Sequence, residues 1–517
     1  MIKETEIVCQ PGQHEDEAII KRLAAAAFKI SPEQVSAVKI IKRSIDARGR
    51  KVVYRMQVRV FIQEPIVPES FTVNYPNVKD AKPVIIIGAG PAGLFAALQC
   101  IESGLRPIIL ERGKDVKQRR RDLANINKQG LVNPESNYCF GEGGAGTYSD
   151  GKLYTRSTKR GDVVQVLKTF VAHGASEDIL VDARPHIGTN KLPGIITAIR
   201  ETIQNAGGEV HFDTKVIGLI IEFGKIKGVR TNDGEAWKAD AVILATGHSA
   251  RDIFEMLHRQ NILIEAKPFA LGVRIEHPQE IIDQAQYHCE NRGEHLPPSY
   301  YSLVEQVDGR GVFSFCMCPG GIIAPCATEE NEIVVNGWSP SKRNNPFANS
   351  GTVVQINLED VKGDENDQFR LLYFQQQIEQ IAFTAGGGHL VAPAQRMVDF
   401  AEKRISADLP KNSYLPGTKS ISLDEVLPGW IAGRLRKALP VFGQKMKGYY
   451  TNEAILVGVE SRTSSPVKIP RDWETLQHPQ VAGLFPCGEG AGYAGGIISA
   501  AIDGINCAVA AKTYLVV

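Results

Sequence analysis

The sequence predicts an α/β fold, and three patterns support that prediction. An apolar run over 84–87 is followed by a glycine-rich turn, an apolar helix over 92–103 and a second apolar run over 108–110. Such continuous apolar runs are typical of parallel strands that are buried on both faces. A strand, a glycine-rich loop and an apolar helix return near the C-terminus, while residues 1–80 carry a separate strand–helix–strand–strand pattern. We therefore expect a parallel-sheet domain built from two segments, an inserted domain between them, and an N-terminal α+β module.

The N-terminal module, residues 1–80, is expected to be a ferredoxin-like βαββ unit. Strands are predicted near 6–9, 38–45 and 52–61, with an alanine-rich helix over 16–29. The segment 31–34 has the form of a capping box that opens a short helix. Prolines at 65, 68 and 76 then predict a linker.

Basic residues gather on the expected strands of this module: Lys39, Lys42, Arg43, Arg48, Arg50, Lys51, Arg55 and Arg59. They are intermixed with apolar strand residues, which favours a solvated sheet face over an RNA-binding face. An RNA-binding role stays open as the alternative.

The rest of the chain predicts a discontinuous Rossmann-like domain over 83–260 and 430–517. A mixed α/β substrate domain is expected over the inserted residues 261–429. Between 208 and 245, turn signals at 223–225 and 232–234 separate short strand-like segments, which predicts a β-meander.

Composition narrows the classes of protein to consider. The 59 basic and 58 acidic residues give a net charge of +1, so nothing indicates a nucleic-acid or membrane-surface partner. The apolar stretch 83–101 is interrupted by glycines and a proline and does not predict a membrane span. No apolar signal segment is seen at the N-terminus. Nine cysteines without zinc-ligand spacing predict a reduced, cytoplasmic protein without a metal site.

The segment Gly88-Ala89-Gly90-Pro91-Ala92-Gly93 is a GxGxxG fingerprint between an expected strand and an expected helix. The first glycine allows the tight turn, the second admits a pyrophosphate, and the third lets helix and strand pack closely. The helix N-terminus offers free N–H donors to phosphates. Glu111 ends the next strand, where its carboxylate can accept hydrogen bonds from ribose hydroxyls. These features together predict a dinucleotide site.

Three further segments favour FAD over NAD. Residues 241–247 resemble the ATG segment of FAD-binding proteins of the glutathione-reductase type, and 483–497 resemble their C-terminal flavin motif. In that motif an Asp binds a ribitol hydroxyl, whereas this chain has Glu489. A helix beginning near Gly496 would direct its positive end at the flavin and favour the reduced form. The loop 141–152 is rich in glycine and hydroxyl residues, which suits contact with a flat cofactor or a pyrophosphate.

From about residue 83 to the C-terminus, the chain resembles the bacterial family of uncharacterised FAD-dependent dehydrogenases, and the N-terminal module resembles theirs too. The matching stretches are 87–93, 143–152, 316–321, 459–466 and 488–496. The resemblance implies non-covalent FAD, a redox role and no particular substrate. On this basis we expect FAD to contact Gly88, Gly90, Pro91, Ala92, Gly93, Glu111, Arg112, Gly144, Ala145, Gly146, Thr147, Ser149, Asp150, Gly151, Lys152, Val216, Ala245, Thr246, Gly247, Gly488, Glu489, Gly495, Gly496 and Ile497.

Candidates for the catalytic centre are weaker. The loop 143–152 has no cysteine, so the thiol–disulfide chemistry of disulfide reductases is not expected there. Cys316-Met317-Cys318 is interpreted as two small residues packed in a core or beside the flavin, because Cys-x-Cys spacing on a strand does not ensure disulfide geometry. A redox-active pair in the inserted domain stays open as the alternative. The acid–base and anion-binding candidates are His389, Arg396, Glu460, Arg462 and Ser464, with an interdomain ion pair as the alternative for Glu460 and Arg462.

The sequence thus predicts an FAD-dependent dehydrogenase that oxidises or reduces a small molecule by hydride transfer through flavin N5. No second GxGxxG follows a strand, so a nicotinamide nucleotide, NAD(P)H, would serve only as a transient donor. Two alternatives remain open. One is a flavin-bearing RNA-modification or RNA-binding protein, and the other is a regulatory module with structural FAD.

Overall fold

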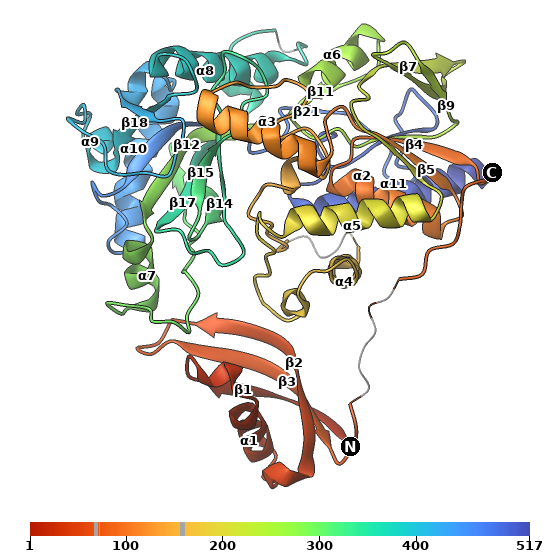
Figure 1. Cartoon of the computed structure of the whole chain (residues 1–517). Helices are drawn as coiled ribbons and strands as arrows, with labels where there is room; N and C mark the ends of the chain where they lie inside the picture. The colour runs from red at the N-terminus through yellow and green to blue at the C-terminus, as the bar shows by residue number, and fades with distance from the viewer. Residues whose placement is uncertain (67–70, 72, 156–160, 365, 517) are drawn as a thin grey trace.

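The computed structural model describes residues 1–66, 71, 73–155, 161–364 and 366–516, and it is a mixed α/β structure (Figure 1). Pro68, one of the three prolines of the expected linker, lies outside the described residues. Among the described residues, no helix combines the length and the apolar character needed to cross a membrane.

The N-terminal part is a three-stranded antiparallel sheet in the order β1-β3-β2, with one helix packed on it. Its core includes Ile20 and Ala24 of the helix against Met56 and Val58 of the central strand. The predicted order of one strand, one helix and two strands is present. Its elements are β1 (Ile2–Cys9), η1 (Gln13–Glu15), α1 (Glu17–Ala27), η2 (Pro32–Gln34), β2 (Val35–Asp46) and β3 (Val53–Ile62).

Arginines of this sheet are engaged by carboxylates. Arg55 pairs with Asp46 at 2.9 Å, and Arg59 pairs with Glu4 at 2.8 Å. Arg43 reaches outside the sheet and pairs with Asp182 at 2.8 Å. These pairs neutralise much of the basic cluster, and the last of them attaches β2 to the rest of the molecule.

The central element of the next part is a five-stranded parallel sheet in the order β22-β10-β4-β5-β6. Strands β4 and β5 are buried apart from their first residues, as their continuous apolar runs predicted, and β10 and β22 are buried as well, whereas the edge strand β6 is half-buried. Val84 and Ile86 of β4 pack against helices, whereas Ile85 and Ile87 pack against the predicted meander. The strands are β4 (Pro83–Ile87), β5 (Arg106–Leu110), β6 (Glu209–His211), β10 (Val242–Leu244) and β22 (Leu484–Pro486).

Helices cover one face of this sheet and the meander covers the other. The helical layer comprises α2 (Pro91–Glu102), α4 (Val163–Ala172), α5 (Leu192–Asn205) and α11 (Ile497–Val516). The opposite layer comprises β7 (Val216–Glu222), β8 (Lys225–Thr231), β9 (Ala236–Lys238) and α6 (Arg251–Arg259). Helix α3 (Val116–Gln129) leaves this part and packs Leu123 and Ile126 into the core of the next.

The third part is a seven-stranded sheet in the order β13-β14-β17-β12-β20-β18-β19. Its strands are β12 (Phe269–Pro278), β13 (Val304–Val307), β14 (Arg310–Cys318), β17 (Phe347–Ile356), β18 (Ala392–Arg396), β19 (Thr418–Ser420) and β20 (Ile455–Glu460). The helices and short turns around it are α7 (Gln279–Tyr287), η5 (Leu358–Asp360), α8 (Arg370–Gly386), α9 (Met397–Ala401), η6 (Leu423–Glu425) and α10 (Gly429–Lys445). The remaining elements are η3 (Gly144–Gly146), η4 (Glu177–Leu180) and the two-stranded sheets of β15 (Ile322–Pro325) with β16 (Val335–Trp338) and β11 (Glu265–Ala266) with β21 (Val467–Lys468).

The expected boundary at residue 430 differs from this arrangement. Helix α10 packs its apolar face into the core of the seven-stranded sheet, and β20 pairs with β12 and β18 inside that sheet. The chain therefore returns to the parallel sheet only after β20, because the apolar run over 455–460 completes the third part and not the second.

Candidate functional site

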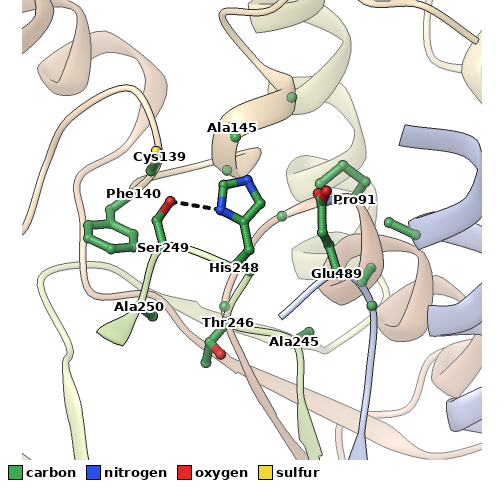
Figure 2. A pocket seen from close by; sticks show the side chains of 18 of the residues that line it. Pro91, Cys139, Phe140, Ala145, Ala245, Thr246, His248, Ser249, Ala250 and Glu489 are labelled. Atoms are coloured by element: carbon green, nitrogen blue, oxygen red, sulfur yellow. Dashed lines mark hydrogen bonds between the residues drawn. The ribbon is translucent and has the colours of Figure 1, made fainter. Parts of the chain in front are cut away.

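A large cavity lies at the carboxyl ends of the parallel strands, where ligands bind in open α/β sheets. It has about 1490 Å³ of empty space, including a part open to solvent, and is lined by both the parallel-sheet and the seven-stranded-sheet parts. Figure 2 shows part of its wall, with Pro91, Ala245 and Glu489. All but three of the expected FAD contacts lie on its wall: Gly88, Gly90, Pro91, Ala92, Glu111, Arg112, Gly144, Ala145, Gly146, Ser149, Asp150, Gly151, Lys152, Val216, Ala245, Thr246, Gly247, Gly488, Glu489, Gly496 and Ile497. The exceptions are Gly93, Thr147 and Gly495.

The three fingerprint glycines occupy different environments. Gly88 has a φ of 103°, and a Cβ there would lie 2.6 Å from the Ala245 carbonyl oxygen. A Cβ on Gly93 would lie 1.9 Å from the Gly88 carbonyl oxygen, so this glycine allows the helix to pack against the turn. At Gly90, by contrast, the nearest atom to an added Cβ is 3.9 Å away. A side chain at Gly90 would enter the cavity without disturbing the protein around it.

Glu111 links the fingerprint to the loops beside it through hydrogen bonds. Its carboxylate accepts hydrogen bonds from the backbone N–H groups of Ala89 (2.8 Å), Gly113 (2.9 Å) and Gly141 (3.0 Å). The side chain is buried at 5% exposure and still lines the cavity. It therefore orders the turn and the loop, and its remaining acceptor capacity faces the ligand space.

The glycine-rich loop lies directly on the fingerprint. A Cβ on Gly144 would come within 3.1 Å of the Gly90 Cα atom. Arg119 of α3 is fully buried and holds this region by donating to the carbonyl oxygens of Asn137, Tyr138, Glu142 and Gly144 at 2.8–2.9 Å. Arg119 was not predicted from the sequence, because nothing in the local pattern distinguishes it from an arginine on the exposed face of a helix.

The C-terminal motif forms another part of the cavity wall. Glu489 lies beside Pro91 in Figure 2, and α11 begins at Ile497 with Gly496 on the wall. Burial raises the pKa of Glu489 to about 7, and the nearby Lys267 offsets only part of that effect. The N-terminus of α11 places free N–H groups and a positive dipole end at this part of the wall.

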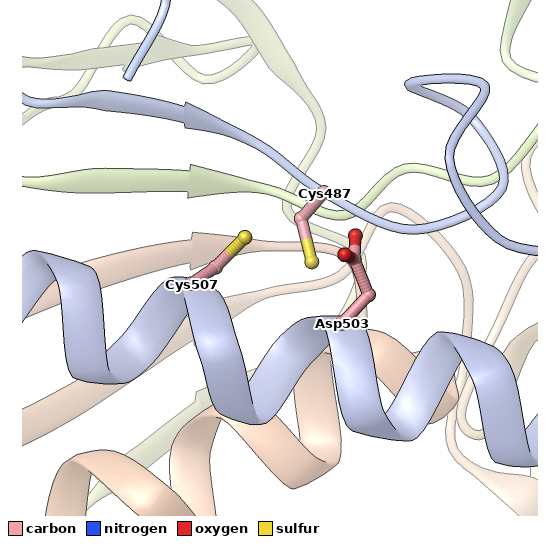
Figure 3. Close-up of side chains that lie close together, drawn as sticks. All are labelled: Cys487, Asp503 and Cys507. Atoms are coloured by element: carbon pink, nitrogen blue, oxygen red, sulfur yellow. The ribbon is translucent and has the colours of Figure 1, made fainter. Parts of the chain in front are cut away.

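Cys487, Asp503 and Cys507 lie close enough together to suggest a metal site (Figure 3). The carboxylate of Asp503 is, however, already engaged by Arg471, at 2.7 and 3.0 Å, and by the Gly488 N–H at 2.7 Å. Arg471 also donates to Cys507 Sγ at 3.5 Å. A guanidinium inside the cluster opposes a cation there, so we interpret the cluster as a support for the Gly488 turn.

Two cavity residues in the loop that follows β10 were not predicted from the sequence. His248 and Ser249 follow the expected ATG segment, and their Nδ1 and Oγ atoms lie 3.0 Å apart in the cavity wall (Figure 2). Burial lowers the pKa of His248 to about 4, and the nearby Arg462 adds to that shift, so the imidazole is neutral at pH 7. Ligands bind at the carboxyl ends of parallel strands, so the position of these two residues shortly after β10 could have indicated that they line the cavity.

Another missed contact is on β14. Cys316 lines the cavity, and Lys152 Nζ lies 3.5 Å from both Cys316 Sγ and Cys318 Sγ. Lys152 and Cys316 are 164 positions apart, so only the fold brings them together.

The structure places the catalytic candidates at different distances from the cavity wall. Arg462 lies on the cavity wall and pairs with the buried Glu332 and Glu379, at 3.0 and 2.9 Å. Glu460 is not on the wall, because its carboxylate pairs with Arg274 of β12 at 2.8 Å inside the seven-stranded sheet. That contact is an ion pair within one sheet and not between domains.

Three candidates lie away from the cavity. His389 is exposed in the left-handed turn that follows α8, with a φ of 57°. Its glycine neighbours serve the end of that helix and not a ligand. Arg396 pairs with Asp408 at 2.8 Å, and Ser464 is absent from the cavity wall.

Comparisons with known proteins agree with this geometry. Residues 268–463 match the family described as FAD-dependent protein, C-terminal domain-like, and residues 83–119 match an FAD binding domain. Residues 1–61 match a domain of unknown function. The second match covers the fingerprint and Glu111.

Among curated proteins, an uncharacterised protein of Clostridium beijerinckii is 40% identical over 514 residues, covering 96% of each chain. A digeranylgeranylglycerophospholipid reductase of Methanosarcina acetivorans is 28% identical over 170 residues, covering 32% of this chain and 37% of the reductase.

Among solved structures, a geranylgeranyl bacteriochlorophyll reductase-like protein of Thermoplasma acidophilum is 13% identical with a TM-score of 0.35, over 84% of this chain and 79% of that one. CtdE in complex with FAD is 12% identical with a TM-score of 0.30, over 83% and 84%. The sequence matches over the full length of the Clostridium protein and over the FAD-binding segment decide the relationship, and the chain belongs to a bacterial family of FAD-dependent oxidoreductases.

Proposed function

We propose that the cavity holds one FAD in extended form and that the protein uses it to oxidise or reduce a small molecule by hydride transfer at flavin N5. The observation that carries this proposal is the lining of one cavity, which includes the fingerprint and Glu111 together with Glu489 and the start of α11. The adenosine would lie at Glu111 and Arg112, the pyrophosphate at Gly90 and the N-terminus of α2.

The residues present fit this cofactor. Gly90 leaves open the space that a pyrophosphate needs, and the glycine-rich loop closes over it. Bound FAD would supply the hydride chemistry, while the chain orients both reactants and excludes water. The N-terminus of α11 favours negative charge at the flavin end and thereby the reduced form.

We further propose that the three parts of the molecule have different roles. Residues 83–260 and 461–517 bind FAD, residues 261–460 complete the substrate side of the cavity, and residues 1–80 form a separate module. A reduced nicotinamide nucleotide would act as a transient electron donor. All nine cysteines are free, which suits a reducing compartment such as the cytoplasm.

Cofactor release tests the proposal. Denaturation of the purified protein should release one FAD per chain, identified by its absorption spectrum and by chromatography. Gly90→Val should fold and yet lose FAD, because its side chain projects into the space for the pyrophosphate, while the atom nearest to an added Cβ is the Gly144 Cα atom at 3.9 Å. Thermal unfolding of the apo-protein and of the variant should coincide. FMN or NAD as the stoichiometric ligand, or full FAD loading of Gly90→Val, would contradict the proposal.

A further inference from the structure

The end of β14 departs from a regular strand at its two cysteines. Its pairing with β17 shifts register between Phe315 and Cys318, and Cys316 has a left-handed φ of 47°. In a regular strand, residues two positions apart are separated by about 6.6 Å, near the upper end of the Cα separations of disulfides. Because β14 is irregular here, the Cα separation of a regular strand does not apply to Cys316 and Cys318. Cys316 lines the cavity, and Cys318 is buried.

Two cations surround the pair of sulfur atoms. Lys152 Nζ donates to Cys316 Sγ and to Cys318 Sγ, each at 3.5 Å. Arg274, which is fully buried, donates to the Cys316 carbonyl oxygen at 2.8 Å and reaches Cys318 Sγ at 3.6 Å. A half-buried ammonium is stabilised by a nearby anion that offsets its desolvation, and the two sulfur atoms are the hydrogen-bond acceptors of Lys152 here.

The same pair lies at the flavin end of the proposed site. Cys316, Lys152, Glu489 and Gly496 all line the cavity, and the charge of Cys316 acts on Glu489. Any planar ring seated between α11 and the glycine-rich loop would therefore lie near the Cys316 sulfur.

We propose that Cys316 and Cys318 form a thiol–disulfide pair that exchanges two electrons with the flavin, with Lys152 stabilising the Cys316 thiolate. This inference rests on the proposed FAD site and gives that site a second redox centre. It also departs from the expectation that the two cysteines are only packing residues.

The exchange balances within the protein and its cofactor. The Cys316 thiolate and the Cys318 thiol become a disulfide: the Cys318 S–H bond breaks and one S–S bond forms. The two electrons and the released proton pass to oxidised FAD, which becomes the reduced anion. One negative charge is present before and after, and the reverse step reduces the disulfide.

Local charges support the assignment of the thiolate to Cys316. A hydrogen bond from Cys318 and the charges of Lys152 and Arg274 hold the pKa of Cys316 well below its usual value, while burial and Asp150 act against them. The Cys318 pKa is raised, first by its hydrogen bond to Cys316 and then by burial. Besides burial, charge interactions with Cys316 raise the pKa of the carboxyl groups of Glu460 and Glu489.

An anaerobic titration tests the proposal. The holo-protein is oxidised with diamide, desalted and titrated with dithionite while the flavin absorbance is followed. We expect four electrons per flavin, two for the flavin and two for the disulfide. The double variant Cys316→Ser, Cys318→Ser should take up two. The control Cys289→Ser, a half-buried cysteine beside the N-terminal module, should keep four.

The outcomes separate this inference from the proposed function. Flavin-loaded wild type that takes up two electrons overturns the inference and leaves the FAD site intact. Four electrons in the double variant also overturn it, and would assign the second centre to other cysteines. Protein that never binds flavin contradicts the proposed function itself. Alkylation and mass mapping of the oxidised protein should find Cys316 and Cys318 unmodified until a reductant is added.

The role of Lys152 has its own readout. In the Cys318→Ser holo-protein, the Cys316 thiolate cannot enter a disulfide and should give a long-wavelength charge-transfer band with the flavin. Adding Lys152→Met should move the pH midpoint of this band upward by about one unit or more, because an opposite charge within ~4–6 Å favours the ionised form. An unchanged midpoint would show that Lys152 does not stabilise the thiolate.

Discussion

At the scale of single residues, Glu111 links the protein to the nucleotide site. Three backbone N–H groups depend on its carboxylate, so Glu111→Ala should destabilise the apo-protein as well as weaken FAD binding. Leaving such donors buried without a partner costs about 1–3 kcal/mol. Urea unfolding of apo-protein measures this loss, with Glu209→Ala on the neighbouring β6 as a half-exposed control that should change little. Unchanged apo stability in Glu111→Ala would mean that the carboxylate does not order the turn.

Glu489 gives a pH dependence of stability with a definite sign. Its pKa in the folded protein is raised by burial to about 7, above the ordinary value of 4.5. Between these two values the unfolded chain has released the proton and the folded chain still holds it, so this group lowers stability as pH rises from 4.5 to 7. Glu489→Gln removes this loss because glutamine does not titrate. Between pH 4.5 and pH 8 the free energy of unfolding of the apo-protein should therefore fall by about 1–3 kcal/mol less in the variant than in the wild type. Parallel pH profiles of thermal unfolding check this, and superimposable profiles would contradict it.

At the scale of elements, the sequence was most informative where structure is local. Strands β4 and β5, helix α2 and the meander turns depend on runs of a few residues, and the structure contains them as predicted. The expected boundary at residue 430 placed Ile455–Glu460 in the parallel-sheet domain, whereas this segment forms β20 of the seven-stranded sheet. A short apolar run suits either sheet equally. Choosing between sheets depends on contacts between residues far apart in the chain, which a strand pattern does not encode.

The candidate site shows the same division. The fingerprint, Glu111 and the C-terminal motif were found because each is a short pattern with a known mechanism. Arg119 and the contact of Lys152 with Cys316 were missed, since each joins segments distant in sequence. His389, a candidate for acid–base work, lies in the exposed turn that follows α8 and away from the cavity, a placement that depends on the fold and not on the local sequence.

At the scale of the whole molecule, the cavity exists because two parts meet over it, and buried ion pairs hold them together. Arg251 of α6 pairs with Glu332 at 2.8 Å and with Glu379 of α8 at 2.7 Å. Arg462 pairs with the same two carboxylates. The cluster is buried and lies between the layer of α6 and the core of the seven-stranded sheet.

This cluster of buried ion pairs predicts that substitutions of two arginines of α6 differ greatly in their effect on the free energy of unfolding. Arg251→Met leaves two buried carboxylates with one cation, and removing one partner of a buried pair typically costs about 3–5 kcal/mol. Arg259 of the same helix pairs with Glu255 at 3.8 Å, with its side chain 67% exposed, so Arg259→Met should cost less than about 1 kcal/mol. Urea unfolding midpoints of both variants measure the difference. Holo-protein should also lose FAD sooner in Arg251→Met, since both parts line the cavity. Equal midpoints in the two variants would show that the cluster does not join the parts.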